Sequence, residues 1–365
     1  MDILLIKKAI NRIFPPGSEI ADNSLDVPPK ERFWLIPGKN GPRWLIPQEK
    51  KYGLLVFQQW SPYDLASIVK WKILYAVYSA GQFGMLPGVR ALGISGSSKN
   101  EWQHIGWKKE TKPVPIIYFG TPCKTRKLVT LLIDSKTSKP NMVAKFPLSK
   151  PASEIIKHEF RILCDLQQKK INLTPRPLFF DNEAGIASQE AISGRPTGRR
   201  YTILHHKFLE SLRLSNNTIS LDEKSLQLKK ELISIPILRP SLKLLLNGLL
   251  NNCTDSTQFL PVYVHGDFTP WNIKKIEDGS LMALDWEMGD PNGLPVYDFF
   301  YFFLIQSYLF NDKFNSNRIF KLLPENKKKY PLVQILNFTA ASLGLRLAKE
   351  EQNIEYLEKF LRSIK

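Results

Sequence analysis

Short apolar runs separated by polar loops occupy the chain between residues 114 and 192. The first three runs are VPIIYFG, LVTLLID and NMVAKF, and the loops between them are TPCKTRK and SKTSKP. Runs of this length, rich in β-branched and aromatic residues and joined by short loops, predict an antiparallel meander. Further along the chain, TPRPLFF and GIASQEAI predict two more strands.

A helical pattern separates the third run from these last two strands. Residues 149–168 hold apolar side chains three or four positions apart, which is the spacing of one helical face. The apolar positions are Ile155, Ile156, Phe160, Leu163 and Leu166. Ser153 is the predicted N-cap, because a serine side chain can accept a hydrogen bond from an early helical N–H group.

Beyond residue 200 the pattern is mostly helical. The sequence SGRPTG first interrupts the strands and predicts a linker. Helical periodicity follows in LDEKSLQLKKELISI and SLKLLLNGLLNN, and further helices are predicted from about 332 to 364. The order of elements is a small sheet with one helix, a short linker and a larger helical domain.

Residues 1–110 differ in composition from the rest and show no group of candidate catalytic residues. They hold six of the eight tryptophans. The unit W-L-I-P occurs at Trp34 and again at Trp44, on either side of GKNGP, which predicts two short strands joined by a turn. Trp34, Trp44, Trp60 and Trp71 could stack on sugar rings, but packing in a core or an interface is favoured.

Composition is that of an ordinary globular protein. The chain has 365 residues, of which 43% are hydrophobic and 23% charged, enough for two or three domains. The three cysteines form no CxxC pair and the five histidines show no zinc-ligand spacing, so a reducing, cytoplasmic location without zinc is expected. The N-terminal MDILLIKKAINRIF is amphipathic and basic, and lacks the features of a signal peptide.

The formal net charge of +17 favours anionic partners such as nucleotides, phosphorylated substrates or acidic lipid. Since no basic arm alternates with aromatic residues, no specific nucleic-acid partner is expected. Two apolar stretches, ILYAVYSAGQFGMLPGV and VYDFFYFFLIQSYLF, fall short of the ~20 apolar residues of a membrane span. The second predicts a buried core helix. The first predicts either a packed helix and loop or a peripheral contact with an anionic membrane surface.

Three oxygen-bearing side chains follow apolar segments in the stretch VHGDFTPWNIKKIEDGSLMALDWEMGD. Asn272 follows Asp267 by five positions, and Asp285 follows Asp267 by 18. The residues between Asn272 and Asp285 predict a hairpin around EDGS, which would return Asp285 to the neighbourhood of Asn272. A carboxylate and an amide oxygen suit Mg²⁺ bound together with phosphate oxygens. Asp267 could then accept the proton of an attacking hydroxyl.

A magnesium ion bound with phosphate oxygens and a carboxylate that accepts a hydroxyl proton are parts of a phosphoryl-transfer site. Such a site also needs a cation on the nucleotide phosphates. Lys145, in the third strand, can supply it. A glutamate on the following helix should hold this lysine, and Glu159 is preferred over Glu154 because it lies deeper in the helix. The alternative interpretation makes Lys145 a solvated edge-strand residue.

The segment VHGDFTPWNI, followed by ALDWE, resembles the signature of the aminoglycoside phosphotransferases and choline kinases, small-molecule relatives of the protein kinases. The resemblance covers roughly residues 114–345. It implies an α+β, two-lobed protein kinase-like fold, in which a small antiparallel sheet with one helix accompanies a larger, mainly helical lobe. The chain would then divide into an N-terminal extension (1–110), an N-lobe (111–194) and a C-lobe (195–365).

The resemblance also implies roles for individual residues. Asp267 would be the catalytic base, Asn272 and Asp285 the metal ligands, and Lys145 the ligand of the ATP phosphates, with Glu159 as its partner. His265 would brace the catalytic loop. Gln189, Glu190, Ala191 and Ile192 would form the hinge whose backbone meets the adenine.

Three features depart from the family pattern. The phosphate loop GTPCKTRK lacks G-x-G-x-x-G, so its grip on the nucleotide would rest on Gly120 and backbone amides. The D-F-G of protein kinases is D-W-E here, and no A-P-E segment is present. A small-molecule substrate is therefore expected rather than a protein. Two roles stay open: Asp298 could cap its helix or contact the catalytic loop, and Glu287 could reach substrate or lie on the surface.

The sequence thus predicts an ATP- and Mg²⁺-dependent phosphotransferase acting on a hydroxyl of a small molecule. The acceptor could be a sugar, an amino alcohol, an aminoglycoside or a lipid-linked saccharide. One alternative is a catalytically silent kinase fold that binds nucleotide as a scaffold. Another is a basic protein that binds membrane or nucleic-acid surfaces.

Overall fold

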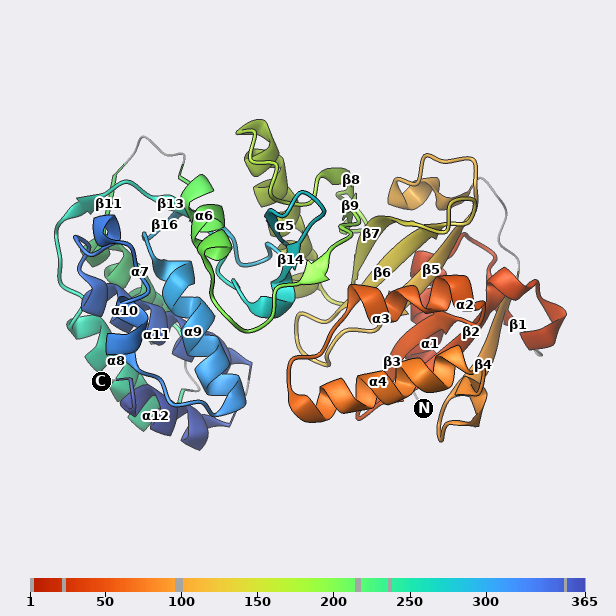
Figure 1. Ribbon diagram of the computed structural model, residues 1–365, viewed down its shortest axis with the longest axis horizontal. Helices are drawn as coiled ribbons and strands as arrows, with labels where there is room; N and C mark the ends of the chain where they lie inside the picture. Colours follow the sequence, from red (N-terminus) through yellow and green to blue (C-terminus); the bar gives the residue numbers. More distant parts are fainter. Residues whose placement is uncertain are drawn as a thin grey trace. The chain divides into compact units, whose positions relative to one another are not determined.

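The computed structural model describes residues 3–21, 24–95, 101–213, 218–235, 238–350 and 353–364. The chain forms two compact units, each made of two segments of the sequence. Unit 1 comprises Met1–Gly198 and Lys274–Glu287, and unit 2 comprises Arg199–Ile273 and Met288–Lys365. Figure 1 labels the helices and strands of both units.

Unit 1 is built around a nine-stranded sheet with the strand order β1-β4-β2-β3-β5-β6-β7-β9-β8. The predicted meander is confirmed, because β5, β6 and β7 are antiparallel neighbours, with Ile116 opposite Leu131 and Thr130 opposite Ala144. The strands of this half of the sheet are β5 (Pro113–Tyr118), β6 (Lys127–Asp134), β7 (Pro140–Pro147), β8 (Pro177–Asp181) and β9 (Ile186–Glu190).

The same sheet continues into the N-terminal region. The two W-L-I-P copies form the predicted hairpin of β2 and β3, and β3 pairs with β5 through Trp44 opposite Tyr118 and Leu45 opposite Ile117. The strands here are β1 (Glu19–Ala21), β2 (Arg32–Gly38), β3 (Gly41–Pro47) and β4 (Arg90–Ser95). Residues 1–110, which the sequence sets apart as an extension, therefore contribute four strands to the sheet that carries Lys145.

Alternate side chains of β3 point to opposite faces of the sheet and fill a core on each face. Leu45 belongs to one core, together with residues of α1. Trp44 and Ile46 belong to the other, together with Tyr78 of α4. The tryptophans Trp34, Trp44, Trp60 and Trp71 pack in or against this second core. The helices of unit 1 are α1 (Ile3–Ile13), α2 (Lys50–Gly53), α3 (Leu55–Gln59), α4 (Leu65–Ser79) and α5 (Lys150–Gln168).

Helix α5 forms where the apolar spacing predicts a helix, but its predicted N-cap is wrong. The cap is Ser149, whose Oγ accepts a hydrogen bond from the Ala152 N–H at 3.3 Å. The helix begins before Ser153 because Pro151 fits the first helical turn, where its missing N–H leaves no hydrogen bond unmade. The buried side chains of α5 are Ala152, Ile156, Glu159, Ile162, Leu163 and Leu166.

The hairpin predicted after Asn272 is confirmed. Strands β14 (Ile273–Lys275) and β15 (Leu281–Ala283) are neighbours in a three-stranded sheet, and the turn is closed by the Ile276 N–H, which donates to Ser280 O at 3.0 Å. The third strand is β10 (Arg195–Pro196), which pairs with β14. The predicted linker SGRPTG thus contains a short strand, whose partner lies far along the sequence.

Unit 2 is mainly helical, as the periodicity predicts. Its helices are α6 (Ile203–Ser211), α7 (Leu221–Ile233), α8 (Pro240–Asn251), α9 (Tyr297–Phe310), α10 (Ser316–Phe320), α11 (Leu332–Lys349) and α12 (Ile354–Arg362). Its strands are β11 (Ile219–Ser220), β12 (Gln258–Phe259), β13 (Val262–Val264) and β16 (Asp290–Gly293). Strands β13 and β16 pair with each other and hold the segment that leads into the HGD sequence.

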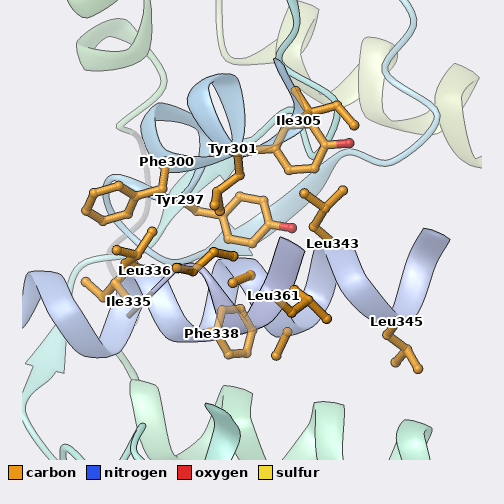
Figure 2. Packing of buried hydrophobic residues seen from close by; sticks show 14 of the residues in the cluster. Tyr297, Phe300, Tyr301, Ile305, Ile335, Leu336, Phe338, Leu343, Leu345 and Leu361 are labelled. Atoms are coloured by element: carbon orange, nitrogen blue, oxygen red, sulfur yellow. The ribbon is translucent and has the colours of Figure 1, made fainter. Parts of the chain in front are cut away.

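Helix α9 is the buried core helix that its apolar sequence predicts. Figure 2 shows side chains of α9, including Phe300 and Ile305, packed with Leu336 and Leu343 of α11. Burying each such side chain stabilises the fold by about 1.5–3 kcal/mol. In the part of the chain that the structure describes, no helix is long and apolar enough to cross a membrane.

Candidate active site

Lys145 lies in the interior of the unit 1 sheet. It faces Val129 of β6 on one side and Ala187 of β9 on the other. Its Nζ donates to both carboxylate oxygens of Glu159, at 2.7 and 2.6 Å. Lys145 is 5% exposed and Glu159 is 2% exposed, whereas Glu154 is on the surface. Lys145 is therefore a buried, paired lysine, and its partner on α5 is Glu159.

Asp285 joins this pair from the segment after β15. Its Oδ1 accepts hydrogen bonds from Lys145 Nζ at 2.6 Å and from Lys127 Nζ at 3.4 Å. The backbone of Asp285 has φ +64°, a left-handed conformation that costs a non-glycine residue about 1–2 kcal/mol. Such strain is held in place by surrounding contacts and tends to occur at functional sites.

Lys127 and Glu287 complete a cluster of charged groups in unit 1. Lys127, the first residue of β6, contacts the Glu287 carboxylate as well as Asp285. Burial, and then the neighbouring charge of Asp285, raises the pKa of Glu287 to about 6. Burial opposes the charged form of Lys145, but the carboxylates of Asp285 and Glu159 outweigh it and raise the Lys145 pKa. Glu287 is thus part of a charge network and not an isolated surface residue.

The predicted phosphate loop turns at Gly120, between β5 and β6. Gly120 has φ +67°, and a Cβ at this position would lie 2.3 Å from the carbonyl oxygen of Lys127. Only glycine fits this turn. The loop is also held by Arg126, whose Nε donates to Phe119 O at 2.9 Å. The backbone that reaches Lys127 is therefore fixed by local contacts.

The predicted hinge runs from Gln189 and Glu190, at the end of β9, to Ile192. Two of its backbone groups already have protein partners: the Ala191 N–H donates to Asn141 O at 3.1 Å, and Ile192 O accepts from Lys274 Nζ at 2.9 Å. Lys274 is buried and also donates to Gln59 Oε1 at 2.5 Å. Burial lowers its pKa to about 8. An adenine contact through those two groups would compete with these bonds.

In unit 2, the HGD turn is anchored to α9 by Asp298. The carboxylate of Asp298 accepts hydrogen bonds from the His265 N–H at 2.6 Å and the Gly266 N–H at 3.0 Å. Val296, and not Asp298, is the N-cap residue of α9, and it makes no side-chain cap bond. Of the two roles open from the sequence, Asp298 therefore has the contact with the HGD turn, which the sequence predicts as the catalytic loop. Burial raises its pKa to about 7.

The turn itself requires a glycine and is closed by a histidine. Gly266 has φ +74°, and a Cβ there would lie 2.3 Å from Met288 O. His265 is fully buried, and its Nδ1 accepts a hydrogen bond from the Asp267 N–H at 3.2 Å. These contacts fix the backbone at Asp267.

The Asp267 carboxylate has three hydrogen-bond donors. Asn272 Nδ2 donates to Oδ2 at 2.9 Å, and Tyr301 Oη donates to Oδ1 at 2.9 Å. Arg346 Nη2 lies 3.2 Å from Oδ1, and Arg346 Nη1 also donates to Tyr301 Oη at 2.7 Å. Two oxygens together offer about four acceptor positions. The described residues fill three of these positions, which leaves one for a further donor.

The side-chain amide of Asn272 is oriented by Asp267. Its amide nitrogen is engaged by Asp267, so the amide oxygen points away from that residue. In the chain, Asn272 directly precedes β14, and Asp285 follows β15 by two residues. Among the described residues there is no group of three or more His, Cys, Asp or Glu suited to a metal. An amide oxygen and a carboxylate oxygen are each of the ligand type that fits Mg²⁺, which is usually bound through one or two protein oxygens together with substrate phosphates.

Sequence reasoning missed four residues of these clusters. Lys274 is buried and Lys127 is half-buried, but nothing in the pattern separates them from the many scattered surface lysines. Tyr301 lies among aromatic core residues of α9. Arg346 could have been noticed from the sequence, since it is a single charged residue within the apolar run LGLRLA of α11.

Several solved structures of small-molecule kinases resemble this chain. A thermostable mutant of aminoglycoside phosphotransferase APH(4)-Ia matches with a TM-score of 0.50 at 9% identity, covering 70% of this chain and 94% of that chain. Choline kinase LicA from Streptococcus pneumoniae matches with a TM-score of 0.44 at 17% identity, covering 65% of this chain and 89% of that chain. An ethanolamine kinase from Plasmodium vivax matches with a TM-score of 0.41 at 12% identity, covering 81% and 88%. No protein-family model and no curated protein matches the sequence.

The first of these likenesses shows the fold. The chain has the kinase-like α+β fold of that aminoglycoside phosphotransferase, with one unit built on an antiparallel sheet and one mainly helical. The fold class implied by the VHGDFTPWNI and ALDWE segments is thus confirmed.

Proposed function

We propose that this protein is an ATP- and Mg²⁺-dependent phosphotransferase that transfers the γ-phosphate to a hydroxyl of a small molecule. The observation that carries the proposal is the pair of clusters, with Lys145, Glu159 and Asp285 joined in unit 1, and Asp267 held by Asn272 in unit 2. Each cluster contains buried charged groups, arranged around Lys145 Nζ in unit 1 and around the Asp267 carboxylate in unit 2. Such clusters are typical of catalytic sites.

In this proposal, unit 1 holds the nucleotide. The ammonium group of Lys145 would bind the phosphates, and Glu159 would keep it in place through two charge-assisted hydrogen bonds. Lys127 would add a second positive charge beside it. Asn272 and Asp285 would hold Mg²⁺, which, when bound, neutralises charge on the β- and γ-phosphates.

Unit 2 would supply the base. The acceptor hydroxyl donates to the open position on the Asp267 carboxylate, which takes the proton as the hydroxyl oxygen bonds to phosphorus and the bond to ADP breaks. Tyr301 and Arg346 keep the carboxylate oriented, and the His265 turn keeps its backbone fixed. No covalent intermediate with the protein is required.

The acceptor class is a hydroxyl-bearing small molecule such as a sugar, an amino alcohol, an aminoglycoside or a lipid-linked saccharide. The net charge of +17 leans against a cationic aminoglycoside. The three cysteines are free thiols, which supports a reducing, cytoplasmic location. The intact Asp267, Asn272 and Asp285 argue against the alternative of a silent, nucleotide-binding scaffold.

The test is a metabolite-pool screen with ATP radiolabelled at the γ-phosphate, using wild-type protein and the Asp285→Ala variant. The proposal predicts a labelled small molecule with the wild type and none with the variant. Equal labelling by both proteins would contradict the assignment of Asp285. Nucleotide binding by the wild type without labelling of any pool would favour the scaffold.

We further propose that α4 makes a peripheral contact with an anionic membrane surface. One face of α4 packs inward through Tyr78, while Leu65, Val69 and Ile73, four residues apart, are 83%, 57% and 54% exposed. Lys72, beside them on the helix, is also exposed. An outward apolar stripe flanked by lysine suits a surface of acidic lipid.

Vesicle sedimentation tests this contact. The wild type should sediment with phosphatidylglycerol–phosphatidylcholine vesicles, and the Val69→Asp/Ile73→Asp variant should stay in the supernatant. Leu244→Asp, which changes a side chain of α8 that is 76% exposed, is the matched control and should sediment like the wild type. Equal sedimentation of all three proteins would contradict the role of α4.

A further inference from the structure

Unit 2 contains an open cavity of about 580 Å³ that has no part in the mechanism above. Its walls come from Arg199–Tyr201 at the start of the unit, from the second half of α9, and from the turn and short helix that follow. Cavities of about 300–1,000 Å³ are typical of small-molecule sites. None of the three residues that donate to the Asp267 carboxylate lines this cavity.

The cavity wall is strongly cationic. It includes Arg199, Arg200, Lys313 and Arg318, against a single acidic residue, Asp312. Asp312 forms an ion pair with Arg199. Within the described ranges of the chain, no carboxylate lies within ion-pairing distance of Arg200, Lys313 or Arg318. The cavity therefore presents three uncompensated positive charges to its contents.

Arg199 is already fixed in position. Its guanidinium group lies 3.8 Å from the centroid of the Phe310 ring, and its Nε donates to Gln306 Oε1 at 3.3 Å. Gln306 is buried and is held in turn by Phe302 O. A preorganised wall lowers the entropic cost of binding a ligand, because fewer side chains must be ordered.

The rest of the wall combines aromatic and aliphatic side chains with the polar Gln306, Ser307 and Asn315. Its apolar lining includes Tyr201 and Phe303, and also Phe314 and Ile319, which are buried. An inorganic anion would contact only the cationic part of this wall. A ligand with both a phosphate group and a ring or carbon skeleton would use the whole of it.

We propose that this cavity binds a phosphorylated small molecule. Arg200, Lys313 and Arg318 bind its phosphate group, since guanidinium groups match phosphate oxygens in a bidentate geometry. Tyr201 and Phe303 contact its organic part. This site goes beyond the proposed phosphotransferase reaction, because binding here requires neither nucleotide nor turnover.

Isothermal titration calorimetry with glucose 6-phosphate, in EDTA and without nucleotide, tests the site. Wild-type protein should bind glucose 6-phosphate and should not bind glucose. The Arg200→Gln/Arg318→Gln variant should bind at least about 100-fold more weakly, because it loses two charge-assisted hydrogen bonds and each loss weakens binding by about tenfold or more. The matched control, Lys359→Gln/Arg362→Gln, removes two exposed charges of α12 and should bind like the wild type.

Three results would overturn the proposal. The first is an absence of glucose 6-phosphate binding by the wild type. The second is an equal loss in the cavity variant and the α12 control, which would reflect overall charge. The third is loss of binding on Lys145→Ala, which would place the sugar phosphate in unit 1. Inorganic phosphate binding as tightly as glucose 6-phosphate would contradict the part assigned to Tyr201 and Phe303.

Discussion

The carboxylate of Asp267 is positioned by side chains that lie far from it in sequence. Tyr301 and Arg346 both donate to Oδ1, and Asn272 donates to Oδ2. Each contact favours the ionised carboxylate and restricts its rotation. At the scale of single residues, the proposed base is thus defined as much by α9 and α11 as by its own loop.

The contact from Tyr301 can be removed without changing the core. Tyr301→Phe keeps the ring and loses two hydrogen bonds of the hydroxyl, one donated to Asp267 and one accepted from Arg346. The bond to Asp267 is worth about 0.5–1.5 kcal/mol. We expect kcat to fall by about 2- to 13-fold, with an unchanged KM for ATP, in steady-state assays with the acceptor found by the labelling screen. The control is Tyr308→Phe on the same helix, whose ring is also buried. Equal kcat values for the two variants would contradict a positioning role for Tyr301.

Asp298 gives a prediction on pH. Because burial raises its pKa from 3.8 to about 7, the folded protein binds a proton between about pH 4 and 7 that the unfolded chain does not. The free energy of unfolding contributed by this group therefore falls as pH rises through that window, by up to about 4 kcal/mol. Asp298→Asn should remove this slope, as measured by urea unfolding at a series of pH values between 4 and 7.5. Parallel pH profiles for variant and wild type would contradict the prediction.

The sequence predicts Asp267, Asn272, Asp285 and Lys145 as site residues because their spacing in the chain is itself the signal. The contacts of Tyr301 and Arg346 with Asp267 were not predicted, because they depend on helix packing. In the chain these two residues lie 34 and 79 positions from Asp267. A tyrosine in an aromatic helix and an arginine near a helix end both have ordinary structural uses.

At the scale of elements, the N-terminal strands and the strand of Lys145 form one sheet. Strand β3 pairs directly with β5, and β7 follows in the same sheet. The hairpin of β2 and β3 was predictable, since its turn is local in sequence. The pairing of β3 with β5 was not, because strand neighbours far apart in sequence leave no periodic signal.

Because β3 and the strand of Lys145 belong to one sheet, a destabilising substitution in β3 should also disrupt the Lys145 cluster. Leu45→Ala removes a buried side chain next to β5 and should lower the free energy of unfolding by about 2–5 kcal/mol. Nucleotide binding and the secondary structure of the whole of unit 1 should then be lost in the same urea transition. The control is Leu244→Ala, at an exposed position, where a change within about 0.5 kcal/mol is expected. Nucleotide binding that survives the unfolding of residues 1–110 would contradict this account.

At the scale of the whole molecule, the fold persists at very low sequence identity. The likeness to an aminoglycoside phosphotransferase holds at 9% identity. A kinase-like fold was predictable because a few motif residues are constrained by local geometry, such as Gly266 against Met288 O. The nine-stranded sheet and the cavity beside α9 were not predictable, since they depend on contacts summed over many elements.

The transfer reaction itself tests the central claim most directly, when turnover and nucleotide affinity are measured on the same protein. Phosphoryl transfer from γ-labelled ATP and the Kd for Mg·ATP should be compared for the wild type and Asp267→Asn. The account predicts that labelled product falls at least about 100-fold, as for loss of a general base, while the Kd changes by less than about twofold, since Asp267 does not hold the nucleotide. Product formed by Asp267→Asn at the wild-type rate would contradict it.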